Sequence, residues 1–457
     1  MAAGSGALLG ASVIAGCASS LVHPKPVAGS NPVILTWRPG TPGIGQTSLT
    51  TAAKLMYQAT EPFRAQHKGI DIHFDYAGGW NGGDLTSWTS AFTSGTAPDV
   101  AEIWANPWVF PEKGFLLDLA PFIRKDNLDM TVWPSGALDY VHVLSARGPQ
   151  NGGLYYLPAY LNTLAVAVNK GVVSGHGLGF PAPDWTYANW TRLAEALTQR
   201  TSSGHVSPRA GMLLMWTQIP PPFLLHAFGG GYVDPTNDLR SGLTGSGTLD
   251  FFNWVIPLIK AGVVASGNPW VQNLGSGYCA TELYQSAFLV EAVHQFSGLD
   301  WDFYLMPVGA AGRFSAGYID VVGVSAATKQ PELAYEFAKW LTWDPVFSAA
   351  MMRLSLRSPM RKDQWAQWAH VVQSIAPPLA GKNLQAFTDV ATGDQGSVWS
   401  GRVFRYDNTG VASILANWWS KMLYRGQDVT TALKQAAQQV DALESIGASG
   451  KASKASS

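Results

Sequence analysis

Charged side chains are scarce in this chain of 457 residues. Asp, Glu, Lys and Arg make up 13% of it, and the formal net charge is -1, whereas about a quarter of the residues of a typical soluble protein are charged. A protein that binds nucleic acid needs a basic face to displace counterions from the phosphates, and the sequence has no cluster of Lys and Arg to form one. We therefore expect no nucleic-acid partner.

Long apolar runs and cysteines are also scarce. Beyond the N-terminal segment, no run approaches the ~20 apolar residues that a membrane-spanning helix requires. The two cysteines are Cys17 and Cys279, and if Cys17 carries a lipid, Cys279 has no partner for a disulfide. Cys279 is then expected to be a small buried hydrophobe, and packing must supply the stability of the fold.

Motifs of enzymes and metal sites are absent as well. The nine histidines form no HExxH motif and no close pair with a cysteine, so we expect no metal site and no cofactor. The run Gly323–Ala327 lacks the final glycine of a nucleophile elbow. Asp300 and Asp302 flank Trp301 just before an expected strand and would point to opposite faces, unlike the carboxylate pair of a glycosidase. The protein is therefore not expected to be an enzyme.

The N-terminus carries a processing motif. Val13-Ile14-Ala15-Gly16-Cys17 places a cysteine after small residues at the end of an Ala/Gly/Leu/Val-rich run, which is typical of a lipoprotein signal peptide. We expect residues 1–17 to be this signal, with lipidation at Cys17, and residues 18–30 to be a tether. Residues 1–16 contain no Lys or Arg, although a signal peptide normally opens with a basic region, so a disordered tail stays the alternative.

Apolar periodicity predicts an α/β fold. Strand-like and amphipathic helical runs alternate along the chain and are separated by Gly, Pro and Asn turns. The expected strands cover residues 33–37, 70–74, 99–104, 165–170 and 317–324, and the expected helices residues 54–66, 185–198, 250–261 and 331–341. This alternation predicts mostly parallel sheets flanked by helices, with ligand contacts on loops at the carboxyl ends of strands. Residues 447–457 are too poor in apolar side chains to pack and are expected to be disordered.

Several runs occur in the order found in one protein family. They are Ser94–Val100 followed by Gly114–Leu119, Tyr156–Pro158 followed by Val168–Lys170, Trp185-Thr186 before a helix, Met306–Gly309, and Glu332–Leu341. In these runs the chain resembles the extracellular solute-binding proteins of ABC importers, in particular the sugar-binding group that includes maltose-binding proteins. The resemblance covers roughly Val33 to Leu443.

The resemblance implies a two-lobed periplasmic-binding-protein-like fold, in which each lobe is a sheet flanked by helices and a ligand cleft and hinge lie between the lobes. Residues 31–157 and 306–342 would form the first lobe, and residues 158–305 and 343–446 the second. The implied protein is a monomer at the extracellular face of the membrane or in the periplasm. It would capture a sugar or oligosaccharide by hinge closure and deliver it to ABC permease subunits. The alternatives are a receptor for a glycerol-phosphate-type ligand and a glycan-acting enzyme.

Aromatic residues are abundant, with 19 Trp, 15 Tyr and 19 Phe, and several stand beside turn residues. Sugars present apolar C–H faces ringed by hydroxyls, so a sugar site needs aromatic platforms and hydrogen-bonding side chains. The candidate contacts are Trp37, Arg38, Trp80, Asn81, Trp104, Tyr160, Asn162, Trp216, Trp270, Tyr318, Asp320 and Arg357. Core packing stays the alternative for Trp37, and an ion pair the alternative for Arg357. A glycerol-phosphate-type ligand would need Arg357 or Arg38 in the cleft.

Overall fold

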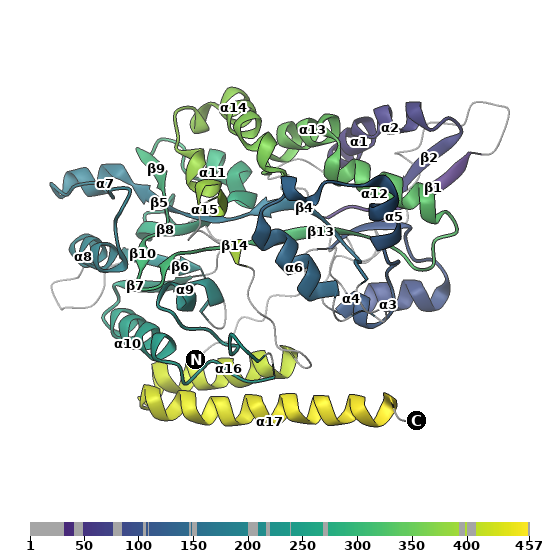
Figure 1. Cartoon of the computed structure of the whole chain (residues 1–457). Coiled ribbons are helices and arrows are strands. Elements are labelled where there is room, and N and C mark those ends of the chain that lie inside the picture. The colour runs from purple at the N-terminus through teal and green to yellow at the C-terminus, as the bar shows by residue number, and fades with distance from the viewer. Residues whose placement is uncertain are drawn as a thin grey trace, which may run out of the picture. The chain divides into compact units, whose positions relative to one another are not determined.

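The structure is a computed structural model of the whole chain (Figure 1). It describes residues 32–40, 49–75, 85–103, 107, 109–145, 148, 153–199, 209–215, 220–237, 239–267, 273–392, 398–399 and 408–455.

The chain folds into two compact units. Unit 1 consists of residues 1–130, 141–160 and 320–360, and unit 2 of residues 131–140, 161–319 and 361–457. The second contribution to the first lobe, expected at residues 306–342, corresponds in the structure to residues 320–360 of unit 1. Apart from the short segment 131–140, the chain passes between the units at three points, after Tyr160, before Asp320 and after Met360.

The sheet of unit 1 has five strands in the order β2-β1-β3-β13-β4. Their bounds are β1 (Val33–Arg38), β2 (Ile70–Phe74), β3 (Val100–Ile103), β4 (Leu157–Asn162) and β13 (Tyr318–Val324). Strand β1 runs parallel to β2 and β3, whereas β13 runs antiparallel to β3. Strands β4 and β13 each have one end in unit 1 and the other end in unit 2.

The helices of unit 1 cover its sheet and enclose an aromatic core. They are α1 (Leu49–Ala59), α2 (Glu61–Gln66), α3 (Leu85–Ser94), α4 (Val109–Glu112), α5 (Ala120–Asp126), α12 (Pro331–Trp343) and α13 (Pro345–Ser355), with α6 (Ser135–Ser145) beginning in unit 2. Helix α13 starts sharply because the Asp344 carboxylate accepts from the Val346 and Phe347 N–H groups and Pro345 occupies the first turn. The buried faces of α2 and α12 bring Phe63 and Phe337 into contact, with ring centroids 5.0 Å apart.

The sheet of unit 2 also has five strands, in the order β7-β6-β8-β5-β9. Their bounds are β5 (Leu164–Asn169), β6 (Ala210–Met215), β7 (Val264–Gly267), β8 (Cys279–Gln285) and β9 (Trp301–Tyr304). Strand β6 is parallel to β7 and β8, and β5 is antiparallel to β8 and β9. All six residues of β5 are buried, as expected for a continuous apolar strand covered on both faces.

Shorter elements and helices complete unit 2. The short strands are β10 (Val308–Gly309), β11 (Gly312–Arg313), β12 (Ser315–Ala316) and β14 (Val398–Trp399). The helices are α7 (Lys170–Gly175), α8 (Tyr187–Leu197), α9 (Pro222–Ala227), α10 (Ser246–Lys260), α11 (Leu289–Gln295), α14 (Trp365–Ile375), α15 (Asp389–Thr392), α16 (Asn408–Tyr424) and α17 (Val429–Ala455). The 3-10 turns are η1 (Met130–Val132), η2 (Ser286–Phe288), η3 (Lys362–Gln364), η4 (Pro377–Leu379) and η5 (Leu384–Phe387).

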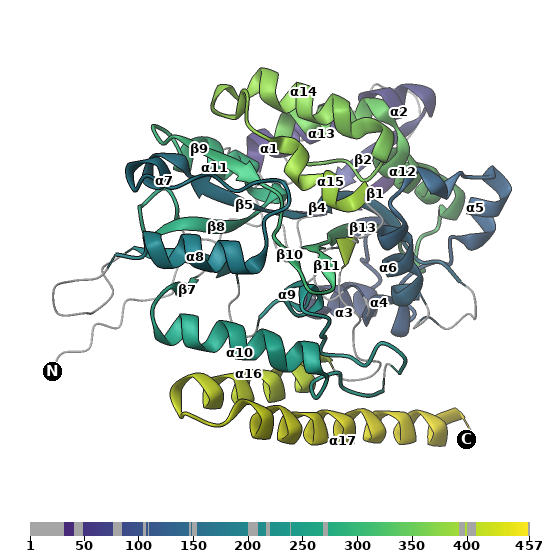
Figure 2. The same ribbon diagram turned by 60° about the vertical axis from the view of Figure 1, so that its left-hand side comes forward.

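The core of unit 2 joins its sheet to the C-terminal helices. Helices α16 and α17 lie side by side, and α10 packs against both of them (Figure 2). Phe252 of α10 meets Trp419 of α16, with ring centroids 5.6 Å apart, and Val440 of α17 is fully buried in the same cluster. Helix α8 begins with a capping box formed by Thr186 and Asn189, which fixes its start one residue after Thr186.

The predicted α/β fold with two helix-flanked sheets is confirmed, and three details differ. Both sheets are mixed rather than mostly parallel, because β13 and β5 insert antiparallel strands. The expected helix at residues 54–66 is two helices, α1 and α2, which meet at Thr60 beside Pro62. Helix α17 continues to Ala455, inside the tail of residues 447–457 for which the sequence predicts disorder. Alanine is the best helix former and lets the helix propagate from its packed part.

None of the described helices is long and apolar enough to cross a membrane.

Candidate functional site

Three of the predicted contact residues meet in unit 1. Tyr160 lies on β4, Asp320 on β13, and Arg357 follows the end of α13. Arg357 Nη1 lies 3.0 Å from Asp320 Oδ2, and the guanidinium carbon of Arg357 lies 4.8 Å from the centre of the Tyr160 ring. All three side chains are buried, so they form an internal cluster of charge rather than an open surface.

Glu102 is a fourth member of this cluster, and sequence reasoning missed it. Arg357 Nη1 donates to Glu102 Oε1 over 2.8 Å, and Glu102 is only 4% exposed. The backbone N–H of Gly40 also donates to this carboxylate. A Cβ atom on Gly40 would lie 2.1 Å from Glu102 Oε1, so only glycine permits this approach. We call Glu102, Tyr160, Asp320 and Arg357 the buried charge cluster.

The local backbone explains how these side chains reach one another. Val322 of β13 pairs with Glu102 of β3, and Asp320 lies two residues from Val322 on the same face of the strand. Helix α13 ends with Leu356 in the left-handed conformation, at φ 55°, which turns the chain toward β4. The following segment is held there because the Met360 N–H donates to the Ala159 carbonyl over 3.2 Å.

Burial dominates the electrostatics of the buried charge cluster. It raises the pKa of the Glu102 carboxyl from 4.5 to about 7, because Arg357 offsets only part of the desolvation and the charge of Asp320 adds to it. Burial, and then the charge of Glu102, raise the pKa of the Tyr160 phenol well above its usual range. Burial disfavours the charge on Arg357, but Asp320 and Glu102 outweigh it and raise the pKa of the guanidinium. The burial of Glu102 therefore favours the neutral form of its carboxyl despite the nearby guanidinium.

Arg38 is half of a second ion pair, whose partner is Asp75. Its side chain is 0% exposed, and Nη2 lies 2.5 Å from Asp75 Oδ2. Its Nη1 donates to Ser87 Oγ over 3.2 Å, and its guanidinium carbon lies 5.1 Å from the centre of the Trp88 ring. In this structure the chain itself uses the hydrogen-bonding and stacking surfaces of the guanidinium, and the role of Arg38 as a ligand contact stays a prediction.

Trp37 lies in the core of unit 1, which is the alternative that the sequence left open for it. The side chain is 1% exposed. Its ring centroid lies 5.3 Å from that of Phe74, 5.5 Å from that of Phe337 and 6.1 Å from that of Phe347. These neighbours come from β2, α12 and α13 of the same unit, so the indole contributes to the aromatic core of unit 1.

The remaining predicted contacts divide between unit 2 and residues that the structure does not describe. Asn162 is buried at 3% exposure, whereas Tyr318 is 42% exposed. Of the three predicted aromatic contacts within the described ranges, Trp37 and Tyr160 are buried and Tyr318 is exposed. The positions outside the described residues are Trp80, Asn81, Trp104, Trp216, Trp270 and the predicted lipidation site Cys17.

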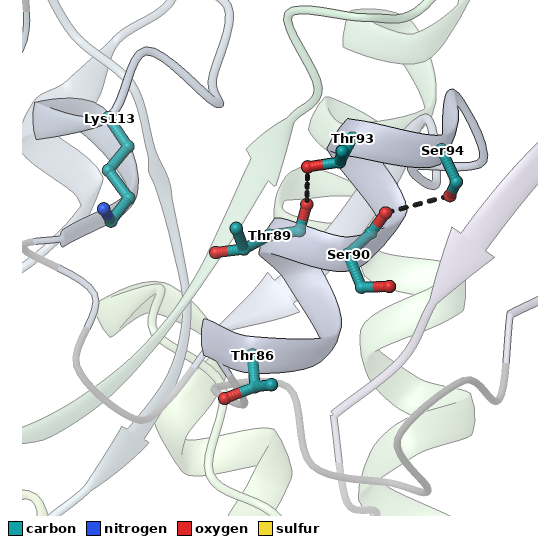
Figure 3. A pocket seen from close by; sticks show the side chains of 6 residues that line it. All are labelled: Thr86, Thr89, Ser90, Thr93, Ser94 and Lys113. Atoms are coloured by element: carbon teal, nitrogen blue, oxygen red, sulfur yellow. Dashed lines mark hydrogen bonds between the residues drawn. The ribbon is translucent and has the colours of Figure 1, made fainter.

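Unit 1 also has a surface depression of about 530 Å³ beside α3. Five hydroxyl side chains of α3 and one lysine line it (Figure 3), and all six are exposed: Thr86, Thr89, Ser90, Thr93, Ser94 and Lys113. Two of the hydroxyls bond back to their own helix, Thr93 to the Thr89 carbonyl and Ser94 to the Ser90 carbonyl. The depression has no aromatic platform, so it lacks the stacking surface of a sugar site.

The described part of the chain brings together no group of three or more His, Cys, Asp or Glu side chains that would hold a metal ion. Cys279 is buried and free, as predicted for a small hydrophobe.

Comparison with known proteins identifies the family. Residues 46–345 match the family described as bacterial extracellular solute-binding protein. The chain belongs to that family. No curated protein sequence matches it. The resemblance drawn from the sequence is thus confirmed at the level of the family, whose members bind solutes.

Solved structures of substrate-binding proteins share the fold of this solute-binding protein at low identity. The ABC substrate-binding protein Lmo0181 from Listeria monocytogenes, in complex with cycloalternan, is 16% identical with a TM-score of 0.69, covering 90% of this chain and 99% of that one. The GacH receptor of Streptomyces glaucescens is 19% identical with a TM-score of 0.63, covering 91% and 98%. UgpB from Mycobacterium tuberculosis, in complex with glycerophosphocholine, is 17% identical with a TM-score of 0.63, covering 91% and 98%.

Proposed function

We propose that this solute-binding protein captures a neutral sugar or oligosaccharide for an ABC importer, by a hinge closure of its two units, and passes it to the permease. The family match over residues 46–345 is the observation that carries this proposal. Proteins of the same fold have been solved with cycloalternan and with acarbose bound. The proposed mechanism is binding rather than catalysis, because a ligand that contacts both units favours the closed arrangement.

The state of two arginines favours a neutral ligand over a phosphate ester. From the sequence, Arg38 and Arg357 are the cationic partners expected for a glycerol-phosphate-type ligand. Arg38 is neutralised by Asp75, and Arg357 by Glu102 and Asp320, so neither presents net positive charge to an anion. The likeness to UgpB, which was solved with glycerophosphocholine, keeps the phosphate ester as the competing ligand in the test.

The test is a thermal-shift screen in which each ligand is present at a large excess. The panel contains neutral mono-, di- and oligosaccharides beside glycerol 3-phosphate and glycerophosphocholine. A ligand at 100 times its dissociation constant stabilises the folded protein by about 2.7 kcal/mol, which raises the melting temperature. Stabilisation by a neutral sugar alone supports the proposal. Stabilisation by the phosphate esters alone, or product formation from a sugar, would overturn it.

Tyr318 provides the site-directed version of this test. The residue is 42% exposed at the start of β13, where a sugar face can stack on an aromatic ring. Tyr318→Ala is expected to weaken sugar binding by roughly 1–3 kcal/mol, the usual effect of losing an aromatic anchor. Calorimetry with the sugar found by the screen measures it. The matched control is Tyr424→Ala, because Tyr424 is 77% exposed at the end of α16 and was not expected to touch ligand. Equal affinity of both variants would exclude Tyr318 from the site.

We further propose that Trp80, Asn81, Trp104, Trp216 and Trp270 supply the other contacts, and that Cys17 carries a lipid. The support for both comes from the sequence: aromatic residues beside turns, and a cysteine after small residues. Cys17→Ser is expected to move the protein from the membrane fraction to the medium or periplasm of its own host. Fractionation of the full-length protein measures this, and equally soluble wild type and variant would contradict the lipid anchor.

A further inference from the structure

The buried charge cluster has one member beside each of the three main chain crossings. Tyr160 is the last residue of unit 1 before the chain leaves along β4. Asp320 is the first residue of unit 1 when the chain returns along β13. Arg357 stands three residues before the third crossing, which follows Met360. Glu102 belongs to no crossing, and its strand β3 lies beside β13 within the sheet.

Arg357 links these segments from the inside of unit 1. Its Nη1 atom lies 2.8 Å from Glu102 Oε1 and 3.0 Å from Asp320 Oδ2, and its guanidinium packs on the Tyr160 ring. The segment that carries Arg357 also pairs with β4 through an antiparallel bridge between Tyr160 and Pro359. Separating any of these segments would leave a buried charge without its partner, which is strongly unfavourable.

We propose that Glu102, Asp320 and Arg357 act as a clamp that fixes the unit-1 ends of the three crossings and so confines hinge bending to the unit-2 side. In this role Arg357 is a positioning residue and does not touch ligand. Bending would then take place in the residues that follow Tyr160 and Met360 and in those that precede Asp320. The function of the clamp in closure rests on the proposed function, whereas its existence is testable without any ligand.

Hydrogen–deuterium exchange of the ligand-free protein tests the clamp. In Arg357→Met, we expect amides of residues 157–160, 320–322 and 357–360 to exchange roughly tenfold faster or more, because the carboxylates lose their shared cation. Strand β2 lies at the opposite edge of the same sheet and is expected to keep its wild-type rates. Asp320→Asn is the milder variant, since Arg357 retains Glu102 as its partner. It is expected to accelerate amide exchange in the same three segments, but by less. This variant replaces Arg357→Met in the test if Arg357→Met does not fold.

Arg38→Met is the matched control. It removes a second buried arginine from the same sheet, paired with Asp75, but that pair lies on no crossing. Arg38→Met is expected to accelerate exchange in β1 and β2. Exchange in residues 157–160, 320–322 and 357–360 is expected to keep its wild-type rate. Acceleration confined to residues 357–360, or spread evenly over β2 and the crossings, would overturn the clamp in either cluster variant.

A ligand-bound measurement separates the clamp from the proposed function. With a saturating sugar from the screen, wild-type exchange is expected to change at residues 161–163 and 361–364 and to stay constant at residues 157–160 and 357–360. Changes on the unit-1 side would overturn the clamp while leaving sugar capture intact. If no sugar binds, the proposed function fails, and the ligand-free exchange pattern still decides the clamp.

Discussion

Glu102 and Glu282 occupy equivalent places in the two units. Each lies on the middle strand of its five-stranded sheet, β3 in unit 1 and β8 in unit 2, and each is 4% exposed. Burial raises the pKa of both carboxyls from 4.5 to about 7. The two carboxyl groups therefore have a similar desolvation cost at a similar position in the sheet. They differ in the partners that offset this cost.

The partners of the two glutamates differ in kind and in distance along the chain. Glu282 Oε2 accepts the Leu274 N–H over 2.8 Å and lies 3.8 Å from the Cys279 thiol, so its partners are neutral and within nine residues. Glu102 is offset by the full charge of Arg357, 255 residues away. The neutral donors around Glu282 stabilise a single loop, whereas Arg357 connects Glu102 to a distant segment of the chain. Of the two glutamates, Glu102 is therefore the one positioned to couple the chain crossings.

The largest expected effect comes from removing one partner of each glutamate. At pH 8, Arg357→Met is expected to destabilise the protein by about 3–5 kcal/mol, because Glu102 and Asp320 are left buried without a cation. Cys279→Ala removes only a neutral, long contact to Glu282 and is expected to cost about 1 kcal/mol. Urea unfolding followed by tryptophan fluorescence measures both changes.

The control for Arg357→Met is Arg361→Met, which removes an ion pair at the surface. Arg361 Nη2 lies 2.6 Å from Asp363 Oδ2, and the Asp363 side chain is 54% exposed, so solvent screens this ion pair. Its loss is expected to cost at most about 1 kcal/mol. If Arg357→Met is no more destabilising than Arg361→Met, the charge cluster of unit 1 is no stronger than a surface pair and the contrast with Glu282 disappears.

Sequence reasoning predicted the elements of the fold better than the surroundings of single residues. Strand β5 and helices α8, α10 and α12 lie close to their expected ranges, because their apolar periodicity is strong. Tryptophan at the end of a strand has the same local sequence whether it faces a ligand or a core. The burial of Trp37 could therefore not be predicted, since its aromatic neighbours on α12 and α13 lie about 300 residues further along the chain.

The candidate site was predicted in part. Tyr160, Asp320 and Arg357 were named as contacts and do come together, but as a buried charge cluster. The sequence contains one indication that Glu102 belongs to the cluster. It is the single charged residue in an otherwise apolar strand, and a buried charge requires a partner. The sequence does not reveal which arginine is that partner, because spacing along one chain carries no information on contacts 255 residues apart.

A smaller expected effect concerns pH and compares the two glutamates directly. Both folded-state pKa values, about 7, lie above the ordinary value of 4.5, so the folded protein binds more protons between these values. The stability that each protonated carboxyl contributes is complete below pH 4.5 and is lost as pH rises through 7. Glu102→Gln and Glu282→Gln keep the uncharged form at every pH. Each is therefore expected to be more stable than wild type by about 1 kcal/mol at pH 5 and by about 3 kcal/mol at pH 8.

Urea unfolding at pH 5, 6, 7 and 8 measures this effect. The two glutamates share no partner, so the double variant is expected to show the sum of the single gains to within about 0.5 kcal/mol. The difference between the sites should emerge when Arg357→Met is added to each variant. With Glu102→Gln, the cost of losing Arg357 falls because only Asp320 remains to be neutralised, whereas with Glu282→Gln it is unchanged. If the coupling free energy between Arg357 and Glu282 equals that between Arg357 and Glu102, the two glutamates do not differ as proposed. Glu102 would then not be distinguished by its ionic cluster, nor Glu282 by its local hydrogen bonds.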